Sequence, residues 1–182
     1  MKTLIVIIII LLSPSVFAQQ TFYIKNASQF FDIKIDVEKC TDYSCKGKAS
    51  FSFYKKNGTK PYQVIDLSET YIQLDKNKQS LTNIDGTYDD EPVLNVDDFN
   101  FDGMEDIAIC NGSNGSYGMP SYNIYLSSRK AHKFVYSKAF SELGRHLVVP
   151  QVDKSKKVLR IFDKDGCCWH ITEEYSVINN KS

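Results

Sequence analysis

The alternation of apolar and polar residues predicts a chain built mostly of β-strands. Residues 31–37 (FDIKIDV) place an apolar side chain at every second position, which is typical of a strand with one buried face. Residues 49–54 alternate in the same way, and Asn57-Gly58 predicts a hairpin turn into a strand over 62–67. Further short apolar runs predict strands at 70–74, 93–96, 107–109, 122–126, 133–136, 147–152, 158–162 and 170–177.

No stretch of twelve or more residues after residue 18 has the 3.6-residue apolar period of a helix. Short strands separated by Gly, Asn and Asp turns predict an all-β, antiparallel fold in the form of a sandwich, a barrel or a small propeller. Residues 75–92 are polar and rich in turn-forming residues, so we expect a long connection there.

The first eighteen residues have the pattern of a secretory signal peptide. Lys2 supplies a positive start, residues 4–12 form an apolar core, and residues 16–18 (VFA) end in a small residue. The apolar run is shorter than the roughly 20 residues that a membrane span needs. We therefore expect cleavage after Ala18 and export to the periplasm. We also expect residues 19–182 to form a single domain without a membrane anchor.

Charge adds little to this picture. The chain has 22 basic and 22 acidic residues, and loss of Lys2 with the signal peptide leaves a net charge near −1. Binding to nucleic acid demands a basic face, so the composition predicts no nucleic-acid partner. We expect recognition to depend on local shape rather than on overall charge.

Residues 98–106 have the spacing D-x-N-x-D-G-x-x-D, which is typical of a calcium-binding loop. Ca²⁺ takes 6–8 oxygen ligands at about 2.3–2.6 Å, and alternate side chains of a curled loop can supply them. Gly103 would allow the backbone to turn back around the ion. We expect one structural Ca²⁺. Its expected ligands are the side-chain oxygens of Asp98, Asn100, Asp102 and Asp106 and the backbone carbonyl of Met104.

The loop differs from an EF-hand, because that loop needs a glutamate at position 12, where this chain has Ile109. Apolar runs of strand type flank it on both sides, so the pattern predicts a strand-loop-strand site. The alternative is an acidic β-turn without metal. Mutual repulsion among three close carboxylates favours the calcium site over that alternative.

These residues also carry a family resemblance. Residues 96–109 (VDDFNFDGMEDIAI) resemble the calcium loop of FG-GAP repeats, the blade motif of integrin-type β-propellers. The longer stretch 92–127, with GSYGMPSYNIYL at 115–126, is similar to a family of small periplasmic immunity proteins. Members of that family neutralise lysozyme-like peptidoglycan hydrolases that bacterial secretion systems deliver. The resemblance implies a compact, propeller-like arrangement and a peptidoglycan hydrolase effector as the protein partner.

Length sets a limit on the propeller. Four-stranded blades run to about 40–45 residues, so the 164 residues left after cleavage hold fewer than four ordinary blades. The sequence also contains a single copy of the calcium motif.

Residues 111–120 (NGSNGSYGMP) predict a protruding loop, because three glycines and a proline suit neither a strand nor a helix. A tyrosine near the tip offers a large contact area at low entropic cost. We expect Ser116, Tyr117 and Met119 to contact the partner by entering the cleft of the hydrolase, and we expect calcium to stiffen the base of the loop. The alternative is an ordinary flexible connection.

The five cysteines fit an oxidising compartment. We expect a disulfide between Cys40 and Cys45 and a second one that joins Cys110 to Cys167 or Cys168, which leaves one odd thiol. Cys167 and Cys168 lack the C-x-x-C spacing of a redox pair.

Catalysis has little support in the sequence, and we expect no enzymatic activity. The three histidines, His132, His146 and His170, have no metal-ligand spacing, and the sequence has no G-x-S-x-G and no phosphate-binding loop. We expect Trp169 in the core. Two other functions stay open: a calcium-dependent adhesion or ligand-binding module of FG-GAP type, and an exported hydrolase with an unrecognised carboxylate pair.

Overall fold

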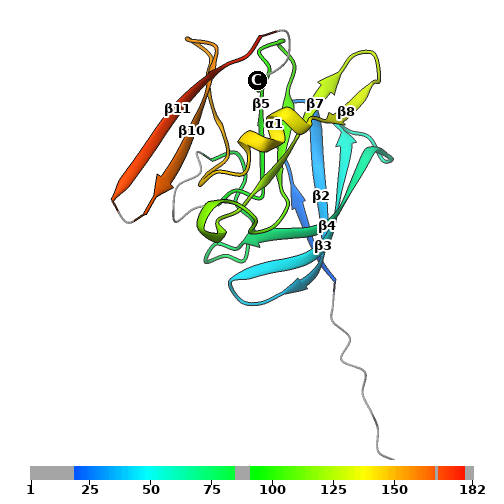
Figure 1. Cartoon of the computed structure of the whole chain (residues 1–182). Coiled ribbons are helices and arrows are strands. Elements are labelled where there is room, and N and C mark those ends of the chain that lie inside the picture. The colour runs from blue at the N-terminus through cyan, green and yellow to red at the C-terminus, as the bar shows by residue number, and fades with distance from the viewer. Residues whose placement is uncertain (1–18, 85–90, 167, 179–182) are drawn as a thin grey trace, which may run out of the picture.

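The computed structural model describes residues 19–84, 91–166 and 168–178, and these ranges fold into three antiparallel sheets with two short helical segments (Figure 1). The all-β, antiparallel class is therefore confirmed. Across the described ranges the sheets close into neither a barrel nor a propeller, so the propeller-like arrangement stays a prediction. The expected signal peptide (1–18) and Cys167 lie outside the described residues. Among the described residues, no helix is both long and apolar enough to span a membrane.

The first sheet has the strand order β1-β2-β3-β4. The predicted turn at Asn57 joins the third and fourth strands, and Asn57 has a φ of 62°. The strand nearest the N-terminus was not predicted from the sequence. The four strands are β1 (Gln20–Ile24), β2 (Phe31–Cys40), β3 (Ser44–Lys55) and β4 (Pro61–Gln73).

The strands predicted at 62–67 and 70–74 are one continuous strand, β4. The pairing between β3 and β4 shifts by one residue within this strand. Ala49 pairs with Leu67, whereas Gly47, two residues earlier in β3, pairs with Thr70, three residues later in β4. Such a bulge breaks the two-residue alternation along the strand, which explains why the sequence pattern divided it into two pieces.

The second sheet contains β5 (Leu94–Asp97), β6 (Asp106–Cys110), β7 (Tyr122–Ser128) and β8 (Lys133–Tyr136), in sequence order. The third sheet has the order β11-β10-β9. Its members are β9 (Gln151–Asp153), β10 (Val158–Asp165) and β11 (Trp169–Ser176).

Two local predictions need correction in the region that leads into the third sheet. The strand expected at 147–152 is shorter and begins only at Gln151. The α-helix α1 (Lys138–Leu143) was missed, since six residues cannot show a helical stripe over a twelve-residue window. It buries Phe140 and Leu143 against the second sheet and lies beside β7.

The second sheet is the middle layer of the molecule, between the first sheet and the β9–β11 sheet (Figure 1). All five residues of β6 are buried. Ile107 and Ile109 pack into a core shared with the first sheet, whereas Ala108 and Cys110 pack into a second core with α1 and β10. A continuous apolar run such as I-A-I-C is what a strand buried on both faces requires.

Trp169 is not a core residue. It is 75% exposed, and it begins β11, an edge strand whose side chains are mostly exposed. The expectation that Trp169 lies in the core is therefore wrong.

The disulfide between Cys40 and Cys45 is confirmed. It joins the paired ends of β2 and β3 and fits an exported protein. The second expected bridge is not present at Cys110, which is a free, buried thiol at the end of β6, with its Sγ 3.7 Å from the carbonyl oxygen of Gly112. Cys168 is exposed.

This arrangement predicts how the cysteines react. Peptide mapping without reduction should recover Cys40 and Cys45 in one linked fragment. Iodoacetamide should label Cys110 only after unfolding, because burial raises the pKa of its thiol to about 11 and only the thiolate reacts. Rapid labelling of Cys110 in the folded protein, or recovery of Cys110 in a bridge, would contradict the structure.

Glu91 lies where the end of β4 meets the second sheet, and its backbone N–H donates to the side-chain oxygen of Gln73 at 2.8 Å. Next to it, the buried Tyr122 hydroxyl donates to the carbonyl oxygen of Pro92. Burial raises the pKa of the Glu91 carboxyl from 4.5 to about 7. The folded chain thus holds this proton more tightly than the unfolded chain does, and stability must fall as pH rises from about 4.5 through 7.

Replacing the carboxyl by an amide should remove this dependence. We expect Glu91→Gln to melt about 3–6 °C above wild type at pH 8 and at the same temperature as wild type at pH 4.5. Differential scanning calorimetry at the two pH values measures the difference. If Glu91→Gln raised the melting temperature equally at both pH values, the proton on Glu91 would not be the cause of the increase.

Candidate functional site

Two loops, one at each end of β6, contain the residues that the sequence singled out. We call residues 98–106 the acidic loop and residues 111–121 the tyrosine loop. Because β6 is a five-residue strand, the Cα atoms at its two ends are separated by about 13 Å, which is four rises of roughly 3.3 Å. The expectation that calcium stiffens the base of the tyrosine loop stays a prediction, and any such effect would have to pass through β6, which lies between the two loops.

The carboxylates of the acidic loop turn inward and accept hydrogen bonds from its backbone. The two oxygens of Asp98 accept from the N–H groups of Asp102 and Gly103, at 2.9 and 2.8 Å. The Asn100 side-chain oxygen also accepts from the Asp102 N–H, and Asp102 accepts from the N–H of Met104. Gly103 has a φ of 82°, so the predicted need for a glycine there is confirmed.

Asp106 closes the loop and begins β6. Its side chain is fully buried, and its oxygens accept hydrogen bonds from the N–H groups of Phe99, Asn100 and Ser127. The pKa of this carboxyl is raised to about 7. Burial is the main cause, and the negative charges of Asp102 and Asp98 add to it, whereas the hydrogen bonds from the Ser127 and Asn100 N–H groups act in the opposite direction.

The donor chemistry of the acidic loop fits a hard cation, because every inward-pointing ligand atom is an oxygen. Among the described residues, no basic side chain forms an ion pair with Asp98, Asp102 or Asp106. The nearest interaction of this kind is the attraction between Asp98 and the Lys154 ammonium, which pairs with Asp97. The carboxylates of the loop nevertheless accept hydrogen bonds from loop amides. Among the described residues, no three His, Cys, Asp or Glu side chains lie close enough together to hold a metal ion.

The tyrosine loop is a defined turn in the structure. Its ends pair, with the N–H of Asn111 donating to Ser121 and the N–H of Ser121 donating to Gly112. Residues 116–118 form a short 3₁₀ turn. A side chain at Gly115 would lie 2.7 Å from the carbonyl oxygen of Pro120, so this position requires glycine.

Tyr117 is held in an unusual conformation at the surface. Its φ is 56°, a left-handed value that is rare for a bulky residue, yet 61% of it is exposed. Its hydroxyl accepts a 2.6 Å hydrogen bond from the N–H of Gly166 in the β10–β11 turn. The Lys164 ammonium lies 5.8 Å from the centre of its ring. Strain of this kind is often found at functional sites.

The turn is anchored by a small polar cluster. His146 Nδ1 and Asp163 Oδ2 are 2.7 Å apart, and the Ser116 hydroxyl also bonds to Asp163. Burial alone would raise the pKa of Asp163, but these hydrogen bonds and one from the backbone N–H of Lys164 outweigh burial and lower it. Ser116 is thus half-buried and turned toward this cluster.

Of the three residues expected to contact a partner, the structure leaves one fully available. Tyr117 is exposed, Ser116 is half-buried beside Asp163, and Met119 is 9% exposed and therefore part of the interior. Sequence reasoning missed the hairpin residues Lys164 and Gly166, which contact Tyr117. The sequence D-K-D-G at residues 163–166 is typical of a turn, but no local pattern indicates that this turn contacts the tyrosine loop.

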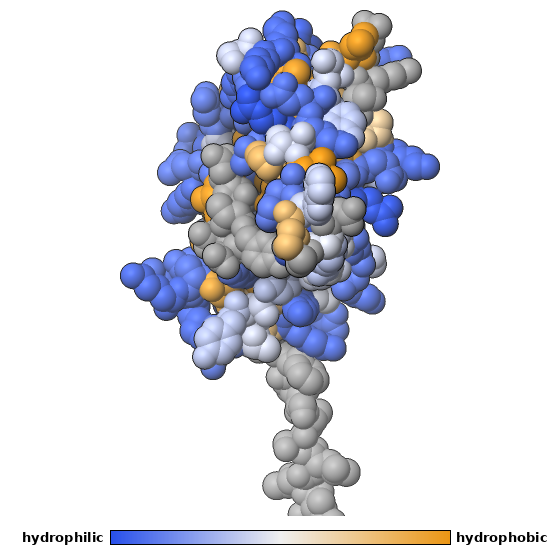
Figure 2. Space-filling model, turned by 60° about the vertical axis from the view of Figure 1, so that its left-hand side comes forward, coloured by the Kyte–Doolittle hydropathy of each residue, from blue (hydrophilic) through white to orange (hydrophobic). Residues whose placement is uncertain are grey.

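The surface on the side of β10–β11 is mostly hydrophilic, with small and separate apolar areas (Figure 2). Such a surface suits a polar, limited contact built around a few anchors.

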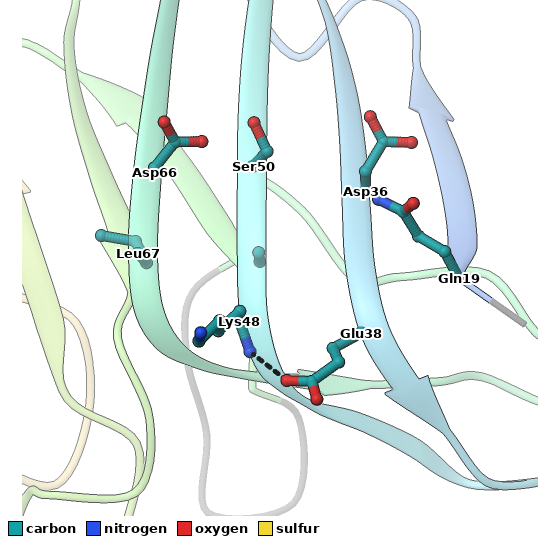
Figure 3. A pocket seen from close by; sticks show the side chains of 8 residues that line it. Gln19, Asp36, Glu38, Lys48, Ser50, Asp66 and Leu67 are labelled. Carbon is teal, nitrogen blue, oxygen red and sulfur yellow. Dashed lines mark hydrogen bonds between the residues drawn. The ribbon is translucent and has the colours of Figure 1, made fainter. Parts of the chain in front are cut away.

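A hollow on the outer face of the first sheet contains several carboxylates and therefore bears on the alternative that the protein is a hydrolase. It has a volume of about 580 Å³ and carries Asp36, Ser50 and Asp66 in a row across three strands (Figure 3). Hydrogen bonds from Lys34 and Thr21 overcome burial and lower the pKa of Asp36. The backbone N–H of Lys48 lowers the pKa of Glu38. A glycosidase needs one carboxyl kept protonated, and neither of these two suits that role.

The sequence matches no protein-family model, and no curated protein matches it. Among solved structures, the chain is similar to one described as a Xanthomonas type IV secretion system related protein. The two are 23% identical with a TM-score of 0.69, over 88% of this chain and 77% of the other. At this identity the similarity establishes a shared fold.

Proposed function

We propose that this chain is an exported, periplasmic immunity protein that binds and inhibits a peptidoglycan hydrolase effector through its tyrosine loop. The observation that carries the proposal is Tyr117, a large side chain exposed at the tip of a bonded turn in a strained backbone conformation. Left-handed backbone at a bulky residue is often found at functional sites, and here it presents an exposed aromatic side chain.

The chemistry around Tyr117 suits the cleft of a lysozyme-like enzyme. Such clefts contain two carboxyl groups, one of them protonated as a general acid. The Tyr117 oxygen accepts its hydrogen bond from Gly166, so its own O–H proton is available for a carboxylate of the partner. The Lys164 ammonium beside the ring adds a positive charge that an acidic cleft would attract.

Three further observations support the proposal. The chain shares its fold with a protein described as related to a type IV secretion system. The Cys40–Cys45 disulfide suits an exported protein. The acidic loop carries the FG-GAP-like motif once, whereas an adhesion module of that type would be expected to repeat it.

We further propose that the acidic loop holds one structural Ca²⁺. Asp98, Asn100, Asp102 and Asp106, with the backbone of Met104, would hold it. When bound, the ion would supply the positive charge that the buried Asp106 lacks among the described residues. The chain's own role is to fix the loop and the start of β6 through the amide bonds to Asp98 and Asp106.

Calcium removal tests this site. EDTA should lower the melting temperature of the wild-type protein by about 5–10 °C, because a ligand at a hundred times its Kd stabilises the folded state by about 2.7 kcal/mol. Asp102→Ala should abolish the response to EDTA. Asp97→Ala is the matched control, since it removes the neighbouring carboxylate that pairs with Lys154, and it should keep the response. Equal melting temperatures with and without calcium would refute the site.

Inhibition assays test the tyrosine loop. Tyr117→Ala should weaken inhibition of the cognate hydrolase about thirtyfold, since loss of a central aromatic anchor typically costs 2 kcal/mol or more. Turbidity of a peptidoglycan suspension measures the inhibition, and calorimetry should show a nearly unchanged melting temperature. Tyr23→Ala, at an exposed tyrosine of β1, is the control and should inhibit like wild type.

Two results would count against the proposal. Full inhibition by Tyr117→Ala would show that another surface contacts the enzyme. A wild-type protein that inhibits none of the exported peptidoglycan hydrolases of its source organism would overturn the immunity function, and the calcium-dependent binding module would then be the better hypothesis.

A further inference from the structure

The end of the molecule opposite the tyrosine loop contains an apolar cavity of about 410 Å³. Phe31 at the start of β2 and Phe30 just before it line the cavity, as does Met104 of the acidic loop. Phe30 is 59% exposed and therefore accessible to a partner. The volume is within the range of sites that bind small ligands or single side chains.

Positive charge lies on two turns next to this cavity: Lys55 lines it, and Arg129 contacts Met104, which also lines it. The β3–β4 turn contributes Lys55 and Lys60, and the β7–β8 turn contributes Arg129, Lys130 and Lys133, all of them exposed. The two turns meet because the Tyr62 hydroxyl donates to the carbonyl oxygen of His132. Both lie on the right-hand side of Figure 1.

These charges are not neutralised locally. Within the described ranges none of the five forms an ion pair with a carboxylate. Lys55 instead lies 5.0 Å from the centre of the Tyr62 ring, and the Arg129 Nε donates to the Met104 sulfur at 3.2 Å. Both cations are thus held by neutral groups at the edge of the cavity.

The nearby acids already have partners. Glu105 accepts hydrogen bonds from the Ser28 hydroxyl and the Gln29 N–H. Asp32 pairs with Lys56 at 2.5 Å. Glu105 lines the cavity and keeps its charge, because both of its partners are neutral donors. Asp102 of the acidic loop lies beside Arg129 and Lys130. The five cations of the two turns outnumber these two carboxylates, although the chain as a whole is neutral.

We propose that this face is a second docking site, which binds an acidic protein segment carrying one apolar side chain. The apolar side chain would occupy the Phe30–Met104 cavity, and flanking carboxylates would lie against Lys55 and Arg129. Charge complementarity selects an anionic partner. The recessed apolar part favours a single side chain over a membrane, which would need apolar groups that protrude.

A model peptide tests this site on the full mature protein. The probe is a fluorescein-labelled heptapeptide with one phenylalanine between two runs of three glutamates, and fluorescence anisotropy measures its binding. Wild type should bind it, and binding should weaken with added salt. Peptides with phenylalanine changed to alanine, or with glutamate changed to glutamine, should each bind more weakly.

Variants of the protein locate the site. The double variant Lys55→Glu and Arg129→Glu should weaken binding about tenfold or more. Phe30→Ser should weaken it about fivefold, with a melting temperature close to that of wild type. The double variant Lys48→Glu and Lys76→Glu matches the charge change elsewhere on the surface and should bind like wild type.

Other outcomes would overturn the inference. Failure of wild type to bind the peptide, or equal weakening by the control double variant, would leave only a general charge effect. Equal weakening by Tyr117→Ala would place the peptide on the tyrosine loop. Sedimentation with phosphatidylglycerol vesicles that is lost in Lys55→Glu/Arg129→Glu and Phe30→Ser would make the face a membrane-binding surface instead.

Discussion

Burial of β6 on both faces is the constraint on which the rest of the structure depends. Ile107 and Ile109 pack toward the first sheet, while Ala108 and Cys110 pack toward α1 and β10. Full burial of each isoleucine side chain is worth about 1.5–3 kcal/mol. A slip of one residue would exchange the two sets of side chains between two differently shaped cores. The strand therefore has one register, and the two loops at its ends start from fixed positions.

Asp106 explains the shape of the acidic loop. A carboxylate at the start of a buried strand is costly unless hydrogen bonds satisfy it, and here three backbone amides do so. Two of them, from Phe99 and Asn100, can reach Asp106 only if the preceding chain curls back. The same curl brings Asp98 and Asp102 near Asp106 and helps to raise its pKa. The geometry that solves a burial problem thus also concentrates negative charge, and a cation would relieve it.

The sequence predicted those parts of the molecule that local pattern determines. Alternation indicated most strands, Asn57 indicated a hairpin, and close spacing indicated the Cys40–Cys45 bridge. The missed features depend on distant partners. Tyr117 contacts Gly166, 49 residues further on, and no local pattern predicts that contact. The five cations near the Phe30–Met104 cavity come from two turns about 70 residues apart, so a balanced composition concealed them.

Two surfaces at opposite ends of a rigid strand should act independently. Tyr117 belongs to one end of β6 and Met104 to the other, and the strand between them is packed on both sides. Close-packed interiors do not deform continuously, so coupling between such surfaces requires a second arrangement of the packed residues. Packing on both faces of β6 leaves little room for one. Substitutions at the two ends are also further apart than the 7–10 Å over which neighbouring sites usually interact. Their effects should therefore add, and binding at the Phe30–Met104 cavity should leave the tyrosine loop free to engage its own partner.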